Sequence, residues 1–475
     1  MPTYGGDEVS AIVLDMGSCT TRAGYAGEDT PKVVIPTSYG FIPGSTEGEP
    51  VQRESRYLFG DFGPTVWRAG MEVLNPMKDS IIEDWGVAEK LMHFVLDHEM
   101  RLTLPGADLE PDERRGVLTE HPLLVTEASW NSKENRERMI ELAFEEFDTP
   151  AYYSVDRSVM CAFAAGKGSA LVVDMGEEVT LVTPVCDGFV LRKGIQKSPI
   201  AGGLLSSLLL STIQSDLPTP ILPQYLIASK PLLSIAPMTV SNEDGTENPA
   251  NNISDSIPPG LVLREERMPG KPGSTTTESY ARYQELRIMH DLKETVCEVL
   301  PRSWDEEVVT SLPLRPFELP TGQLRQFGRT RCTIPEVFFN PTFIPPEFTS
   351  QTQSKNTAST IPTPDLAEAL SLPKLILKSI TVCDTDVQSV LCSNIIITGG
   401  CSLLPGLLDR LDWELRAQAP GMKFKIMAAG NVAERKFGSW LGGSILTSLG
   451  SFHQLWVGKD EYKEQGRSVV HRRCK

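Results

Sequence analysis

The sequence lacks the features that would place it in a membrane or send it out of the cell. No apolar run approaches the roughly 20 residues that a membrane-spanning helix needs. The opening segment, MPTYGGDEVS, has neither the basic nor the apolar region of a secretory signal. We therefore expect a protein that works inside the cell and makes no membrane contact.

Cysteine and histidine patterns typical of disulfides or zinc sites are also absent. The nine cysteines include no close Cys-x-x-Cys pair, and several, such as Cys161 and Cys392, lie in apolar stretches that predict core positions. Histidine is scarce, and His93 and His98 lack the spacing that would place both on one metal. These absences predict reduced thiols and argue against a zinc site.

Basic residues are too few for the general surface of the protein to bind nucleic acid. The chain has 45 Lys and Arg against 62 Asp and Glu, which gives a net charge of −17 at pH 7. Phosphate backbones are bound by clustered basic side chains, so we expect no direct sequence-specific nucleic-acid binding. Basic partners such as histones suit this charge better, although a surface that only maintains solubility explains it equally well.

The length of 475 residues favours two large lobes, and therefore a cleft, over one compact unit. Two similar segments agree with a duplication. Short apolar runs lead into Asp15 and Gly17 and, later, into Asp174 and Gly176, and each is followed by further strand-like residues. Both segments predict a strand, a tight turn and a second strand.

The two Asp-x-Gly hairpins have the chemistry of phosphate binding. Turn amides can face phosphates while the carboxylate reaches a hydrated magnesium ion. One such turn means little, because Asp and Gly are common in ordinary β-turns. A further turn at Gly399 and Gly400, where the backbone could approach a ligand closely, strengthens the prediction of a nucleotide site.

Three polar segments interrupt the regular pattern. Residues 237–279 and 345–364 look like insertions, since both are rich in small and polar residues. Residues 44–56 carry more acid than base and almost no apolar side chains. We expect each of the three to be an exposed loop, and the two insertions to be mobile.

Long segments of the chain resemble actin. The C-terminal run ERKFGSWLGGSILTSLGSFHQLWVGKDEYKEQGRSVVHRRCK is similar to the actin C-terminus almost residue for residue. The segments LTEHPLLVTEASWNSKENRERM, LPTGQLRQFG, PEVFFNP and NIIITGGCSLLPGLLDRL also resemble actin segments, in the same order. YGGDEVSA and TEASWNS are more similar to the nuclear actin-related protein 4 subfamily than to actin itself.

The resemblance implies an α/β fold with the two lobes of an actin-like ATPase, built from duplicated ribonuclease-H-like domains. We expect the first lobe at residues 1–165 and the second at residues 166–475, with the two insertions in the second lobe. It also implies that ATP and Mg²⁺ bind between the lobes, with Asp15 and Asp174 holding the metal through water. The residues implied to contact nucleotide are Asp15, Gly17, Ser18, Cys19, Arg22, Asp174, Gly176, Glu177, Gly202, Lys293, Glu294, Gly399, Gly400, Ser402 and Lys436. Lys293 and Glu294 could equally be a solvated pair on a helix face.

The sequence departs from the actin pattern where actins orient the attacking water. Arg157 falls at the glutamine position and Leu181 at the histidine position. Because loss of such groups typically costs roughly 10²–10⁴-fold in rate, we predict negligible ATP hydrolysis and no enzyme activity. Arg157 could contact a terminal phosphate, or simply pair with Asp156, Glu177 or Glu178. Glu178 replaces a glycine and adds a carboxylate near the phosphates.

The resemblance further implies a scaffold role in the nucleus. The C-terminal run would form a groove for partner helices, with Leu446, Leu449 and Phe452 facing it. Implied partners are monomeric actin, a long helix of a remodeller ATPase or scaffold subunit, and histones or the nucleosome, within chromatin remodelling and histone acetyltransferase complexes. The acidic 44–56 segment would not support filaments.

Two other interpretations remain open from the sequence. An active actin-like ATPase that forms or caps filaments would need groups that Arg157 and Leu181 have replaced. A sugar-kinase or heat-shock type ATPase would share the two lobes and the hairpins, but not the actin-like C-terminus.

Overall fold

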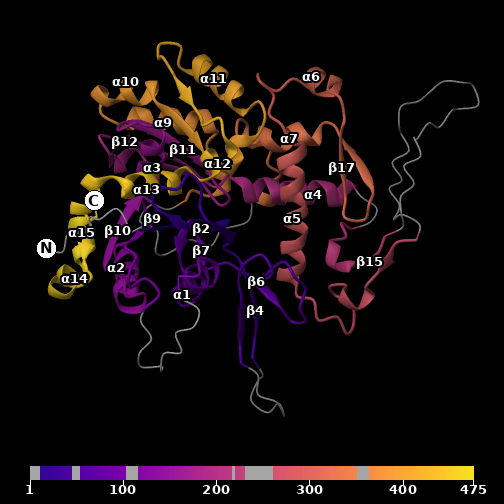
Figure 1. Ribbon diagram of the computed structural model, residues 1–475. Helices are drawn as coiled ribbons and strands as arrows, with labels where there is room; N and C mark the ends of the chain where they lie inside the picture. Colours follow the sequence, from indigo (N-terminus) through magenta and orange to yellow (C-terminus); the bar gives the residue numbers. More distant parts are fainter. Residues whose placement is uncertain are drawn as a thin grey trace, which may run out of the picture.

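The computed structural model describes residues 11–44, 54–102, 116–216, 220–230, 260–349 and 363–474. It has mixed α/β architecture, with a large sheet at the centre of each of two lobes (Figure 1). Within the described ranges, no helix combines the length and apolar character that crossing a bilayer requires.

The sheet of the first lobe has three parallel strands at its centre and antiparallel strands outside them. In spatial order it consists of β21 (Val457–Gly458), β10 (Ala151–Asp156), β9 (Leu123–Glu127), β1 (Ile12–Met16), β2 (Thr20–Tyr25) and β3 (Val33–Pro36). Strands β10, β9 and β1 are parallel, whereas β2 runs antiparallel to both β1 and β3. All five residues of β1 are buried, and its first three, Ile12 to Leu14, are apolar, as expected for a strand that is covered on both faces.

The sheet of the second lobe repeats this topology. It consists of β13 (Phe189–Val190), β12 (Thr180–Cys186), β11 (Ala170–Met175), β19 (Ile395–Thr398) and β20 (Ile426–Met427), and β14 (Gln196–Ser198) also pairs with β12. The hairpin β11–β12 is antiparallel, and β19 and β20 run parallel to β11, as β9 and β10 do to β1. The predicted duplication and the actin-like fold class are therefore confirmed.

Helices cover the sheet of the first lobe and build its core. They are α1 (Trp85–His93), η1 (Phe94–Glu99), α2 (Lys133–Glu141), η3 (Leu142–Glu146), α3 (Arg157–Ala164), α13 (Gly438–Ser448), η10 (Gly450–Gln454), α14 (Lys459–Gln465) and α15 (Val469–Arg473). The core joins β1, β9 and β10 to apolar residues of α1, α2 and α13.

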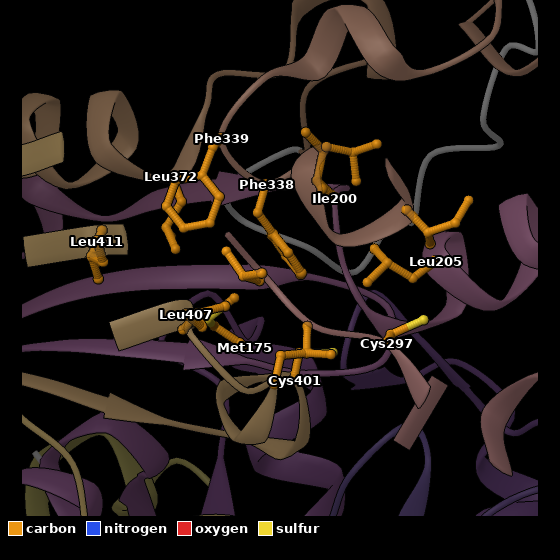
Figure 2. Packing of buried hydrophobic residues seen from close by; sticks show 14 of the residues in the cluster. Met175, Ile200, Leu205, Cys297, Phe338, Phe339, Leu372, Cys401, Leu407 and Leu411 are labelled. Atoms are coloured by element: carbon orange, nitrogen blue, oxygen red, sulfur yellow. The ribbon is translucent and has the colours of Figure 1, made fainter. Parts of the chain in front are cut away.

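The helices of the second lobe surround a separate and larger core. They are α4 (Gly202–Asp216), α5 (Glu278–Val296), α6 (Glu306–Ser311), α7 (Thr330–Glu336), α8 (Pro346–Thr349), α9 (Leu372–Val382), α10 (Thr385–Ser393), α11 (Leu407–Gln418) and α12 (Val432–Lys436). Figure 2 shows side chains of this core from several elements, including Met175 of β11, Leu205 of α4 and Leu407 of α11. The two cores make each lobe a packed unit of its own.

The C-terminal segment belongs to the first lobe, so the expected second lobe at 166–475 is wrong for the last residues. Strand β21 pairs with β10 in the first-lobe sheet, and the buried Trp440 and Phe452 lie in the first-lobe core. Figure 1 shows the yellow α14 and α15 beside the purple α2. The chain thus crosses to the second lobe near α3 and returns before α13.

Small sheets extend from the lobes. They are β4 (Tyr39–Ile42) with β5 (Arg56–Leu58) and β6 (Glu72–Leu74), β7 (Met77–Lys78) with β8 (Ile81–Ile82), β15 (Ile227–Ser229) with β16 (Val262–Leu263), and β17 (Arg315–Glu318) with β18 (Leu324–Phe327). The pair β15–β16 is antiparallel and joins the two sides of the first insertion.

The end of the first insertion is ordered, which corrects the expectation of a mobile loop over the whole of 237–279. Residues 260–279 form β16, the turn η6 (Glu265–Arg267) and the start of α5, and they pack against the first lobe. The Arg267 guanidinium lies 4.0 Å from the ring centre of Trp67, whose indole N–H donates to the Thr276 hydroxyl at 2.8 Å. Aromatic and hydrogen-bonding contacts therefore hold this segment. Residues 231–259, most of 345–364 and most of 44–56 lie outside the described residues.

Close packing of α13 on α3 requires a glycine at one position. A Cβ atom on Gly442 would lie 2.0 Å from the carbonyl oxygen of Met160, and its other near neighbours are backbone atoms too. Backbone cannot move aside as a flexible side chain can. Gly442 therefore sets the distance between α3, which crosses between the lobes, and the returning C-terminal helix.

We predict that Gly442→Ala destabilises the protein by about 1–3 kcal/mol or more, because the added methyl group must push α13 away from α3. Urea-induced unfolding of the full chain measures the effect. Gly450→Ala is the matched control, since a Cβ there meets nothing within 4 Å. Equal stability of the two variants would contradict this account of the packing.

Candidate functional site

A cleft of about 580 Å³ lies where the turns of the two hairpins meet the turn that follows β19. Most of the residues predicted to bind nucleotide line it. They are Asp15, Gly17, Ser18, Cys19, Arg22, Asp174, Gly176, Glu177, Lys293, Glu294, Gly399, Gly400 and Lys436. The structure thus gathers residues from distant parts of the chain around one space large enough for a nucleotide.

The two hairpin turns have matching geometry. The amide of Gly17 donates to the carbonyl of Thr20 at 3.0 Å, and the amide of Gly176 donates to that of Val179 at 3.2 Å. A Cβ atom on Gly17 would lie 3.1 Å from the Thr20 carbonyl oxygen, and a Cβ atom on Gly176 would lie 3.2 Å from the Val179 carbonyl oxygen. Glycine is thus favoured at both positions because each turn is tight.

The Asp15 carboxylate is buried at the centre of the site and accepts four hydrogen bonds. Its Oδ1 accepts from the Thr126 hydroxyl at 2.5 Å and from Arg157 Nε at 3.1 Å. Its Oδ2 accepts from Arg22 and from the Ser439 hydroxyl, both at 2.7 Å. Four donors fill the acceptor positions that a carboxylate offers.

These partners determine the charge state of Asp15. Burial by itself raises the pKa of the carboxyl, but the guanidinium groups of Arg22 and Arg157, helped by the two hydroxyls, lower it to about 2. Asp15 is therefore a carboxylate at any physiological pH, and its negative charge is balanced within the protein.

The two hairpins differ at the position opposite the aspartate. Arg22 is the cross-strand partner of Asp15, whereas Leu181 is the cross-strand partner of Asp174. Burial raises the pKa of Asp174, against the lowering effect of Arg157 and Arg22. Only the first hairpin therefore neutralises its own aspartate.

Arg157 binds Asp15 and not the acids that the sequence suggested. Beyond that ion pair, its guanidinium donates to the carbonyls of Ser80 and Met16. The alternatives of a salt bridge to Asp156, Glu177 or Glu178 are wrong. Asp156 instead caps α3, with its carboxylate accepting from the Ser158 amide at 2.7 Å.

Lys293 and Glu294 point in different directions, so they are not a solvated helix-face pair. Lys293 is buried and donates to the Gly202 carbonyl at 2.8 Å and to the Ser206 hydroxyl at 2.9 Å. Glu294 pairs with Lys436 at 2.9 Å and with His290 at 3.3 Å, at the cleft edge. The hydrogen bond from His290, with a further contribution from Lys436, lowers the pKa of Glu294 to about 2.

Two of the residues predicted to contact nucleotide, Gly202 and Ser402, do not line the cleft but contact residues that do. Gly202 is buried, and a Cβ atom there would lie 2.6 Å from Glu177 Oε2 and 3.2 Å from Lys293 Nζ. Ser402 is also buried, and its hydroxyl donates to the Gly399 carbonyl at 2.6 Å. Both therefore shape neighbouring turns of the site, and their direct contact with nucleotide stays a prediction.

Several residues of the site carry no signal in the sequence. Thr126 and Ser439 lie far from Asp15 along the chain, and only folding brings their hydroxyls within hydrogen-bonding distance of its carboxylate. The Asp79–Ser80 turn has positive φ at both residues, and Lys197 of the second lobe forms an ion pair with Asp79. Single polar residues of this kind are found by three-dimensional placement and not by a motif.

The cleft fits a nucleotide better than it fits the expected magnesium ligands. Tight glycine turns, the volume and the cations at the cleft edge suit phosphates and a base. Asp15, however, already accepts four hydrogen bonds and lies between two guanidinium groups. It is therefore poorly suited to hold a metal through water, which leaves Asp174 as the carboxylate placed for a cation.

The predicted partner groove is corrected at one residue. Phe452 is only 2% exposed, and its ring packs against Tyr153 and Trp456. Leu446 is half-buried, while Leu449 is exposed. Ile445 and Leu455 are also exposed apolar residues of this segment, so Ile445, Leu446, Leu449 and Leu455 form what we call the C-terminal apolar patch.

Comparison with known proteins gives a consistent result over the whole chain. The Actin family model matches residues 6–475. The chain is 38% identical to "Actin-related protein 4" of Emericella nidulans, over 99% of this chain and 98% of that protein. It is 37% identical to the protein of that name from Gibberella zeae, over 99% and 97%, and 34% identical to the one from Arabidopsis thaliana, over 99% and 100%.

Replacement of Asp15 should cost stability in a pH-dependent way. The folded protein lowers its pKa from 3.8 to about 2, so the carboxylate contributes about 2 kcal/mol above pH 4 and loses this contribution as the pH falls toward 2. We predict that Asp15→Asn lowers the free energy of unfolding by at least about that amount at pH 7. The deficit should shrink between pH 4 and pH 2. Urea unfolding across this pH range, with the exposed Asp29→Asn as control, measures it; a deficit that does not change with pH would contradict the assignment.

Proposed function

The chain belongs to the actin family, and from this premise we propose that it is a nonpolymerising, nucleotide-binding scaffold subunit of nuclear chromatin remodelling or histone acetyltransferase complexes. Family membership implies a nucleotide, ATP, and a divalent cation in the cleft. The observation that carries the noncatalytic part of the proposal is the ion pair between Arg157 and Asp15.

The geometry around Arg157 supports a cleft that does not activate water. Hydrolysis needs a group that orients water or takes its proton near the terminal phosphate. Arg157 falls where actins orient that water, and its guanidinium is held by Asp15, Met16 and Ser80. Leu181 is buried in an apolar cluster with Trp130. Neither side chain can accept a proton.

A bound adenine nucleotide would then serve as a structural ligand. It would contact turns from both lobes, so it would stabilise the closed arrangement in proportion to its preference for that form. Gly17 and Gly176 would place their turns against the phosphates, and Lys293 would hold the second turn through Glu177 and Gly202.

The C-terminal apolar patch is the surface that we assign to partners. It presents Ile445, Leu449 and Leu455 to solvent on a segment that Trp440 and Phe452 anchor in the core. Exposed apolar side chains of this kind suit the apolar face of an amphipathic helix. We assign to it the long helix of a remodeller or scaffold subunit and monomeric actin, and we assign histone contact to the net charge of −17.

We predict that the purified full chain releases phosphate from ATP at a rate roughly 10²–10⁴-fold below that of an actin measured beside it. The physical reason is that Arg157 and Leu181 offer no group that orients or deprotonates water. A phosphate-release assay with Mg²⁺ present measures the rate. Turnover equal to that of actin, or sedimentable filaments in the same sample, would favour an active ATPase that forms or caps filaments.

A charge placed in the C-terminal apolar patch should weaken partner binding without unfolding the protein. We predict that Leu449→Asp raises the Kd for an amphipathic partner helix about tenfold or more, since a carboxylate would face apolar side chains. Val390→Asp on α10 is the control, because Val390 is similarly exposed on the second lobe. Affinity measured by fluorescence anisotropy should fall only for the first variant; equal losses would remove the patch from the proposal.

A further inference from the structure

The carboxylate of Glu178 connects the two lobes at the phosphate end of the cleft. Glu178 lies in the turn between β11 and β12 of the second lobe. Its Oε2 accepts from the Ser18 hydroxyl at 2.8 Å and from the Ser80 amide at 3.1 Å, and both donors belong to the first lobe. One oxygen atom thus accepts donors from two separate turns.

These donors are the kind that binds a phosphate. A serine hydroxyl in a tight turn and a nearby backbone amide are typical partners of an anionic oxygen. In this protein a side-chain carboxylate already accepts from both. Glu178 is half-buried, and the loss of solvent around it raises the pKa of its carboxyl. The half-buried carboxylate of Glu178 therefore takes the place that an anionic ligand would take.

The position of Glu178 marks one end of the nucleotide cleft. Ser18 and Glu177 line both this cleft and a second cavity of about 1140 Å³, which Glu178 and Asp79 also line. The contact of Glu178 with Ser18 and Ser80 lies at the boundary between the two spaces. A chain of phosphates that runs past Ser18 toward the second cavity must meet this carboxylate.

Nearby charges do not favour additional phosphate. Asp79 and Glu178 add negative charge at this boundary, and Lys197 forms its ion pair with Asp79. Arg22 and Arg157 are engaged with Asp15. An extra phosphate beside Glu178 would therefore meet like charge in a poorly solvated place.

We propose that Glu178 occupies the terminal-phosphate position of the cleft, so that the site accepts a nucleoside diphosphate and discriminates against the triphosphate. This inference rests on the proposed function, because it refines which nucleotide the scaffold holds. A diphosphate leaves the contact of Glu178 with Ser18 and Ser80 intact. A triphosphate must displace the carboxylate and so break a connection between the lobes.

The test is to measure the Kd of ADP and of ATP, each with Mg²⁺, for the full chain and for variants by isothermal titration calorimetry. The wild type should bind ADP at least about tenfold more tightly than ATP, the scale expected when like charges meet in a protein cleft. Glu178→Ala should bring the ratio close to one by tightening ATP. Glu178→Gln keeps the shape without the charge and should give an intermediate ratio.

Asp291→Asn is the matched control, because Asp291 is an exposed acid that lines the second cavity on α5. It should leave the ADP-to-ATP ratio unchanged. Equal affinities in the wild type, or an unchanged ratio in Glu178→Gln with a normal melting temperature, would overturn the inference and leave nucleotide binding in place. Binding of neither nucleotide would instead overturn the proposed nucleotide-binding function, and this inference with it.

Discussion

The buried Asp15 carboxylate is the interaction on which the geometry of the cleft depends. Its donors come from β2, β9, α3 and α13, as Arg22, Thr126, Arg157 and Ser439. A buried carboxylate is tolerated only when its charge is balanced and its acceptor positions are filled, so these elements must assemble together. The same contacts that complete the core therefore fix Arg157 and the first hairpin turn.

Duplication has given the two lobes one topology but different electrostatics. The position opposite the hairpin aspartate is Arg22 in the first lobe and Leu181 in the second. Asp15 consequently forms structural ion pairs with Arg22 and Arg157, whereas Asp174 lies at the cleft without a cross-strand cation. The second hairpin adds Glu178, whose carboxylate reaches back to the first lobe. The phosphate end of the cleft is therefore more negative and more strongly connected than two copies of the first hairpin would make it.

The sequence predicted the parts of the site that depend on local pattern. The tight turns at Gly17 and Gly176 follow from strand periodicity and glycine spacing, and the structure places both at the cleft. The errors concern orientation and distant contacts. Phe452 turns inward because the rings of Tyr153 and Trp456 pack against it, which no one-dimensional pattern specifies. Ser439 reaches Asp15 only because the C-terminal helix returns to the first lobe.

Protein contacts alone already join the two lobes at several places. Trp67 packs against Arg267 of the second lobe, Asp79 pairs with Lys197, and Glu178 accepts from Ser18. A ligand can shift a conformational equilibrium only by its differential affinity for the two forms. Where the closed form is held by the protein itself, less of that shift is left for the nucleotide to supply. The position of α13 then depends less on bound nucleotide, which suits a subunit whose proposed role is to hold partners in place.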